Sequence, residues 1–212
     1  LVTILKEQIA GIELNSEAAR ISAFSLYIAL LNYLTPPSII EQINEGKKLP
    51  KLILEPKQMT YEQYIRSIAT KDNGTILVGD SFDSRLFPDS PTIFEQNSLF
   101  DTSSSFIFDN NQFDVIIGNP PWGGKLSKNA SYEAKICDQN KKTWCAKHNK
   151  IISDNESSQA FIWRSLAFLK PDGVLGLYVS AGVLFKTQST ALGFQNLLFS
   201  SVCLREVYNF TP

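Results

Sequence analysis

The sequence has few cysteines and almost no histidine. Its 212 residues include three cysteines and one histidine. An odd, sparse cysteine count excludes a disulfide framework and is typical of a reducing compartment, so we expect a cytoplasmic protein. Cys145 and His148 have a metal-type spacing, with Cys137 upstream. A closed zinc site needs a fourth ligand and the chain has no second histidine, so ordinary residues of a polar loop are the favoured interpretation.

Long apolar runs and an excess of charge are also missing. No stretch approaches the ~20 apolar residues of a membrane span. The chain has 20 Lys and Arg against 21 Asp and Glu, so its composition gives no global nucleic-acid signature. With 43% hydrophobic and 19% charged residues it has a soluble globular profile. This profile excludes collagen, a disordered tail and a coiled coil.

Short apolar runs alternate with segments of helical periodicity. The apolar runs predict strands over 9–14, 75–80, 113–118, 174–180 and 206–210. Periodicity predicts helices over 18–34, 157–169 and 190–199, with a turn over 170–173. Asn15 or Ser16 can cap the first helix, and Pro36 stops it. Continuous apolar strands are typical of a mostly parallel sheet with helices on both faces, so the predicted fold class is α/β. The remaining long segments are expected to be insertions: 38–72, 83–111 and 123–155.

Polar groups follow three of the predicted strands. Glu13 ends the first strand, Asp80 ends the second, and Asn119-Pro120-Pro121-Trp122 follows the third. Ligands of open parallel sheets bind at the carboxyl ends of strands, so these groups form the candidate site.

The turn 119–122 is the most informative motif. Its prolines fix φ near about −65° and remove two N–H donors, so the carbonyls before them have no helix or ladder partner nearby. The rigid turn then presents the Asn119 amide oxygen and a backbone carbonyl as acceptors, beside the indole of Trp122. Two converging acceptors and a ring face fit a planar group that carries NH₂. The alternative is a simple turn with a packing tryptophan.

Residues 113–122 resemble the catalytic segment of S-adenosylmethionine-dependent amino-methyltransferases. They most closely resemble the gamma-type adenine-N6 DNA methyltransferases of restriction-modification and phage-defence systems. Stretches that agree with this family in order and spacing are 11–15 with 18–26, 79–82 and 168–176. The resemblance implies a Rossmann-like class I methyltransferase sheet that lacks its first strand, with S-adenosyl-L-methionine as cofactor.

The resemblance also implies the residues of the cofactor site. Glu13, beside Leu14, would accept hydrogen bonds from the ribose hydroxyls of the cofactor. Asp80 would accept from the adenine amino group of the cofactor, with Ser81 and Phe82 flanking that ring.

The same resemblance implies the residues of the catalytic turn, which are Asn119, Pro120, Pro121 and Trp122. Asn119, which would also border the cofactor, and the Pro120 carbonyl would accept from the target amino group. Trp122 would stack on a base flipped out of double-stranded DNA. The implied activity is that of a site-specific, adenine-specific DNA methyltransferase.

The segment after this turn is net basic in a slightly acidic chain. Its lysines lie near Tyr132 and Trp144; they are Lys125, Lys128, Lys135, Lys141, Lys142, Lys147 and Lys150. One hypothesis is a flap that contacts the DNA backbone, with Lys141 and Lys142 among its phosphate contacts. A solvated surface loop is the alternative.

Parts of the family pattern are missing. The glycine-rich cofactor loop should precede Glu13, but residues 1–8 contain no glycine and resemble the tail of the helix after that loop. Together with Leu1 in place of Met, this predicts a truncated chain. Residues 1–212 would form a partial catalytic domain without its target-recognition domain. The missing strand would lie between the strands that end at Glu13 and Asn119, and would leave their edges unpaired.

Two other functions stay open at this point. One is methylation of an amino group in protein glutamine or RNA guanine, by enzymes that share the Asn-Pro-Pro-aromatic turn but are usually shorter. The other is a non-catalytic remnant that binds DNA. Intact Glu13, Asp80 and Asn119 argue against decay.

We expect the 212-residue chain to bind S-adenosylmethionine weakly or not at all, because half of the implied cofactor site is missing. Calorimetric titration of the chain with the cofactor measures this directly. Micromolar binding would contradict the expectation.

Overall fold

All strand pairs formed by the described residues are parallel. The computed structural model describes residues 2–60, 63, 74–87, 112–123 and 126–210. One sheet has the order β1 (Gly11–Glu13), β3 (Ile76–Val78), β2 (Ile53–Leu54). A second sheet pairs β4 (Phe113–Gly118) with β5 (Leu169–Leu177). This mixed α/β architecture with parallel sheets agrees with the predicted fold class.

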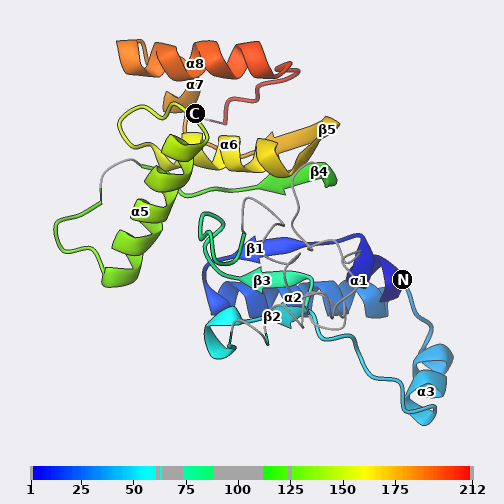
Figure 1. Cartoon of the computed structure of the whole chain (residues 1–212). Helices are drawn as coiled ribbons and strands as arrows, with labels where there is room; N and C mark the ends of the chain where they lie inside the picture. The colour runs from blue at the N-terminus through cyan, green and yellow to red at the C-terminus, as the bar shows by residue number, and fades with distance from the viewer. Residues whose placement is uncertain (1, 61–62, 64–73, 88–111, 124–125, 211–212) are drawn as a thin grey trace, which may run out of the picture. The chain divides into compact units, whose positions relative to one another are not determined.

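The chain divides into two compact units, one around each sheet (Figure 1). Unit 1 contains Leu1–Ser81 and Arg85–Asp109, and unit 2 contains Phe82–Ser84 and Asn110–Pro212. Much of the insertions expected at 38–72 and 83–111 lies outside the described residues.

In unit 1, α2 (Ser16–Asn32) covers one face of the three-stranded sheet (Figure 1). The Asn15 side chain caps this helix by accepting from the amides of Glu17 and Ala18, as predicted for a capping residue. The core between helix and sheet contains Leu5, Ala19, Ala23, Leu30, Leu52, Ile76 and Val78. Leu5 belongs to α1 (Val2–Glu7), a helix that agrees with the predicted helix tail.

The prolines expected to stop the first long helix instead begin the next one. α2 ends at Asn32, and Pro36 and Pro37 are the first residues of α3 (Pro36–Asn44), which Thr35 caps. Proline is favoured at the first helical positions, where its missing N–H has no partner in any case. The short η1 (Pro56–Gln58) begins with a proline as well.

Unit 2 contains four helices among the described residues. They are α5 (Tyr132–Lys147), α6 (Ser157–Phe168), α7 (Gly182–Phe185) and α8 (Ser189–Ser201). Their core contains Phe82, Trp144, Cys145, Ala160, Ile162, Trp163, Val183, Phe194 and Leu198. The predicted helices over 157–169 and 190–199 are confirmed within a few residues. In contrast, α5 lies in a segment that the sequence analysis interpreted as a polar excursion.

The predicted turn at 170–173 is a bulge inside β5. The register joins Phe113 to Leu169 and Val115 to Val174, so residues 170–173 stand opposite Asp114. A β-carbon at Gly173 would come within 3.0 Å of the Asp114 carbonyl oxygen, which explains the glycine. Pro171 has no N–H to donate to a ladder, so residues 170–173 have no register partners on β4.

One face of the β4–β5 sheet is apolar and exposed. Val115 and Ile117 are 62% and 82% exposed, and Val174 is 45% exposed. The register partners Val115 and Val174 point to the same side of the sheet. On the opposite side, Leu177 packs against the core of unit 2. The prediction of a strand buried on both faces is therefore wrong for β4, because the helices of unit 2 cover one face only.

The strand predicted over 206–210 is also wrong. The described residues 203–210 form no strand, and Val207, Tyr208 and Phe210 are exposed. A strand needs a partner for its backbone groups, and this apolar run pairs with no described strand. Within the described residues no single helix is long and apolar enough to span a membrane, although α2 and α3 meet that criterion as a pair bent by 110°.

Replacing Phe194 by alanine should destabilise unit 2 by about 3–5 kcal/mol, because this ring is fully buried and its removal leaves a cavity. Urea unfolding followed by tryptophan fluorescence measures the change. Phe199→Ala on the same helix is the control, since Phe199 is 49% exposed and its loss should cost under about 1 kcal/mol. Equal effects of the two substitutions would contradict the described packing.

Candidate active site

The two acidic residues predicted at strand ends lie at the same edge of the sheet in unit 1. Glu13 is the last residue of β1, and its register partner on β3 is Val78. The Gly79 amide donates to the Glu13 carbonyl at 3.0 Å, and Asp80 follows directly. Parallel pairing thus brings Glu13 and Asp80 to neighbouring carboxyl ends, where ligands of such sheets bind.

The loop after β1 orients the Glu13 carboxylate. Its Oε1 accepts from the Asn15 amide at 2.8 Å, while the Asn15 side chain caps α2. Its Oε2 accepts no hydrogen bond from the part of the chain that the structure describes. Leu14, between Glu13 and Asn15, is 55% exposed. One carboxylate oxygen can therefore accept a donor from a ligand, and the cofactor role of Glu13 and Leu14 stays a prediction.

The three predicted site residues that follow Gly79 have different surroundings. Asp80 is half-buried and Ser81 is buried at the edge of unit 1. Phe82 is 4% exposed and belongs to the core of unit 2. Its ring packs edge-on against Trp144 and Phe161, with centroids 5.7 and 5.0 Å away. Packing accounts for Phe82, and its predicted contact with the cofactor ring stays a prediction.

The turn 119–122 follows β4 directly and leaves two acceptors open. Asn119 is exposed and Pro120 is buried. Among the described residues, neither the Asn119 side chain nor the Pro120 carbonyl has a hydrogen-bond partner. The next carbonyl, that of Pro121, accepts from the Ser158 hydroxyl at 3.3 Å. The acceptors that the sequence analysis singled out are thus available to a ligand.

The indole of Trp122 is fixed at one edge. Its Nε1 donates to the Tyr178 carbonyl at 3.2 Å, and the two rings lie 5.2 Å apart at an angle of 47°. Tyr178 is itself anchored, because its amide donates to the carbonyl of Gly118 at 2.9 Å. Trp122 is nevertheless 51% exposed, so it presents ring surface to a ligand.

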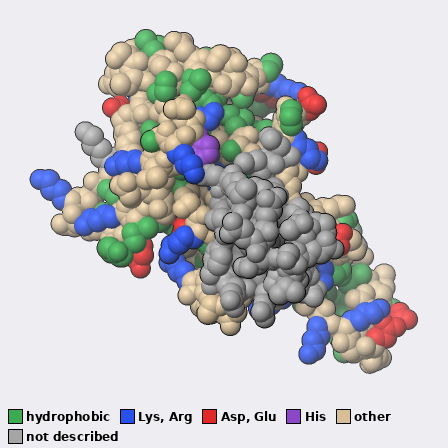
Figure 2. Space-filling view, in the orientation of Figure 1, with side chains coloured by type: hydrophobic (Ala, Val, Ile, Leu, Met, Phe, Trp, Pro, Cys, Tyr) green, Lys and Arg blue, Asp and Glu red, His purple; other side chains and the backbone are tan. Residues whose placement is uncertain are grey.

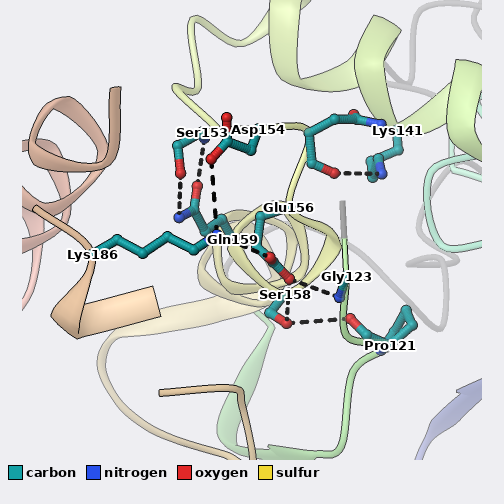
Figure 3. A network of polar contacts seen from close by, with 10 residues as sticks. Pro121, Gly123, Lys141, Ser153, Asp154, Glu156, Ser158, Gln159 and Lys186 are labelled. Carbon is teal, nitrogen blue, oxygen red and sulfur yellow. Dashed lines mark hydrogen bonds and ion pairs between the residues drawn. The ribbon is translucent and has the colours of Figure 1, made fainter. Parts of the chain in front are cut away.

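The start of α6 holds the other side of the turn (Figure 3). The Gly123 amide donates to Oε1 of Glu156 at 2.9 Å, and the Gly123 carbonyl accepts from the Ser157 amide at 3.0 Å. Gly123 has φ of +97°, a conformation that favours glycine. Contacts from α6 therefore fix both Pro121 and Gly123, on either side of Trp122.

Sequence reasoning missed Glu156 and Ser158. The polar run before the apolar part of α6 is typical of a helix start, and the helix itself was predicted. Nothing in that run identifies Pro121 and Gly123 as its partners, because they lie more than thirty residues earlier in the chain. The long sequence separation hid the contact.

The basic segment is folded against α6 rather than free. Lys141 is 5% exposed; its ammonium pairs with Asp138 at 2.9 Å and donates to the Ser157 hydroxyl at 3.0 Å. Trp144 is 6% exposed and packs in the core. The prediction that Lys141 is a phosphate contact of a DNA-binding flap is therefore wrong, because Lys141 is buried and, like Trp144, holds α5 in place.

Other lysines of this segment remain exposed. Figure 2 shows lysine side chains, in blue, over the part of the surface formed by α5. Those exposed on this helix are Lys135, Lys142 and Lys147. Lys142 pairs with Asp138 at 2.7 Å but is half exposed. A DNA contact on this helix stays a hypothesis.

The cysteine and histidine of the metal-type spacing lie at the end of α5. Cys145 is buried, and burial raises the pKa of its thiol to about 11. A neutral thiol is a poor metal ligand. His148 stacks on Trp144 with centroids 4.4 Å apart. Among the described residues no three His, Cys, Asp or Glu side chains gather in a group that could hold a metal ion.

The parallel α/β architecture, with acids at two strand ends and the turn 119–122 at a third, fits a methyltransferase-like fold. The family model for the Eco57I restriction-modification methylase matches residues 7–212, and the chain belongs to this family. Membership supports a role as a DNA methyltransferase of restriction-modification systems. No curated protein and no solved structure matches the chain.

The ion pairs around Asp138 make a pH-dependent contribution to stability. Burial alone would raise the pKa of its carboxyl, but hydrogen bonds from Lys142, Asn155 and Lys141 outweigh it and lower the pKa from 3.8 to about 2. Because the folded pKa is depressed, this stability is present above the unfolded pKa and is lost as pH falls through about 2.

Asp138→Asn should therefore lose this contribution, which is ~2 kcal/mol at neutral pH. Urea unfolding of the wild type and the variant between pH 2 and pH 6 measures it. The difference between the two proteins should shrink as the pH falls. Parallel pH profiles would show that the Asp138 carboxyl is not the titrating group.

Proposed function

We propose that this protein transfers a methyl group from S-adenosyl-L-methionine to the exocyclic amino group of an adenine flipped out of double-stranded DNA. The observation that carries the proposal is the pair of open acceptors on a held turn, the Asn119 amide oxygen and the Pro120 carbonyl. Family membership supports the methyl-transfer chemistry.

The groups in unit 1 fit the proposed cofactor. The open Oε2 of Glu13 suits a ribose hydroxyl, because a carboxylate accepts such donors well. Asp80, at the neighbouring strand end, suits the amino group of the cofactor adenine, with Ser81 next to it. When bound, S-adenosylmethionine supplies a methyl group on a positively charged sulfur. The task of the protein is to bind and orient it.

The groups in unit 2 fit the proposed target. Asn119 and the Pro120 carbonyl would accept both N–H hydrogens of the adenine amino group, which favours a tetrahedral nitrogen with a usable lone pair. That lone pair forms the new N–C bond as the S–CH₃ bond breaks, and one proton of the nitrogen then passes to water. No strong general base is needed, so catalysis rests on positioning and electrostatic complementarity.

Trp122 would hold the extruded base. Bases inside a duplex cannot reach such a turn, so the target must leave the stack and find a new stacking partner. The exposed part of the Trp122 indole offers that surface, and its Nε1 bond to the Tyr178 carbonyl keeps the ring from turning away. The exposed lysines of α5 are candidates for contacts with the DNA backbone.

Asn119→Ala should lower the rate of methyl transfer by about 10²–10³-fold, the loss that follows removal of one group that stabilises the transition state. The measurement is mass spectrometry of N6-methyladenine in unmethylated duplex DNA incubated with protein and cofactor. Asn129→Ala is the control, because Asn129 is exposed and lies outside the turn.

Three results would contradict the proposal. They are an unchanged rate for Asn119→Ala, methyl groups on protein glutamine or RNA guanine but not on DNA, and binding of both DNA and S-adenosylmethionine with no methyl transfer. The last two correspond to the alternatives left open by the sequence.

A further inference from the structure

We propose that Glu156 is a positioning residue, which fixes the catalytic turn through the backbone of Gly123 without touching substrate. The effect of this residue on activity rests on the proposed function. Its effect on the conformation of the turn does not, so the role of Glu156 and the proposed function can be contradicted independently.

Glu156 is a buried carboxylate that serves the turn. It is 6% exposed and precedes α6. Its Oε1 accepts from the Gly123 amide at 2.9 Å and lies 3.3 Å from the Ser158 hydroxyl. That hydroxyl is also 3.3 Å from the Pro121 carbonyl, so its single proton is shared between the carboxylate and the turn. Glu156 and Ser158 together contact both flanks of Trp122.

The other carboxylate oxygen is oriented by a cation from the segment before α8. Oε2 of Glu156 lies 3.7 Å from Nζ of Lys186, which is also 3.9 Å from the Asp154 carboxylate (Figure 3). The backbone carbonyl of Lys186 accepts from Nε2 of Gln195 on α8 at 3.0 Å. A chain of polar contacts thus runs from α8 through Lys186 and Glu156 to Gly123.

This arrangement has a consequence for catalysis rather than for folding alone. Two of the four residues of the turn are prolines without an N–H, and the N–H of Gly123, directly after Trp122, is bonded to Glu156. Without its acceptor, this N–H would draw the turn toward water. A misplacement of about 1 Å in such a group can cost ~10²-fold in rate.

The experiment compares four variants of the full chain in the methyl-transfer assay. Glu156→Ala should lower kcat by ~10²-fold with the KM for S-adenosylmethionine unchanged. Glu156→Gln keeps an acceptor for Gly123 and should recover most of that loss. Lys186→Met should have an intermediate effect. Gln159→Ala is the matched control, because it removes equally buried hydrogen bonds to Ser153 that do not reach the turn.

A second readout needs no activity. In protein labelled with 5-fluorotryptophan, the ¹⁹F resonance of Trp122 is assigned from Trp122→Phe. Glu156→Ala should shift or broaden it, and Glu156→Gln should restore it, while the resonance of buried Trp163 stays in place. Circular dichroism confirms that each variant is folded.

The results separate the two proposals. If the wild type binds S-adenosylmethionine and DNA but does not methylate adenine, the proposed function fails; whether or not it is active, the ¹⁹F spectra still decide the role of Glu156. An unmoved Trp122 resonance in Glu156→Ala would overturn the inference. So would a kcat that falls as much in Gln159→Ala as in Glu156→Ala.

Discussion

Two consecutive prolines remove two backbone N–H donors from the turn that follows β4, and the arrangement around the site depends on the contacts by which unit 2 holds this turn. A turn of this kind cannot rigidify itself by a local hydrogen-bond ladder. Its rigidity comes from groups that arrive from β5 and α6: the Tyr178 carbonyl on one side, and Glu156 and Ser158 on the other. The two acceptors in the middle keep no described partner and remain open to a ligand.

Unit 1 has a similar arrangement, in which some atoms of the site hold the local structure and others stay open to a ligand. Paired strands bring Glu13 and Asp80 to one edge, and the loop that caps α2 uses one oxygen of Glu13 while leaving the other open. In both units some polar atoms at the strand ends have no partner among the described residues: Oε2 of Glu13 in unit 1, and the Asn119 amide oxygen and Pro120 carbonyl in unit 2. Such leftover atoms at the carboxyl edge are what a binding site in a parallel sheet is made of.

Local features of the fold could be predicted from the sequence because they depend on nearby residues. The strand at 113–118, the cap at Asn15 and the helix before Leu169 each follow from an apolar run, a capping side chain or helical spacing. The errors have non-local causes. Residues 206–210 have strand-like composition but pair with no strand among the described residues, and the charge of Lys141 can be buried because Asp138 pairs with it.

The candidate site divides in the same way. The turn 119–122 was found from sequence because its residue types are unusual together. Glu156 is not predictable in this way, because an acid at the start of a helix is common, being favoured by the helix dipole, and its partner Gly123 lies far away in the chain. Residues that would contact a ligand are thus easier to predict from sequence than residues that hold them in place.

Without the bulge at residues 170–173, the number of residues between α6 and Val174 would determine where Tyr178 lies along β4. The register of β5 with β4 is set beyond the bulge, where Gly118 pairs with Leu177, and Tyr178 follows at once. Residues could be gained or lost between α6 and Val174 without shifting Tyr178 along β4. The length of that connection can therefore change while Trp122, in the turn 119–122, keeps its anchor on the Tyr178 carbonyl.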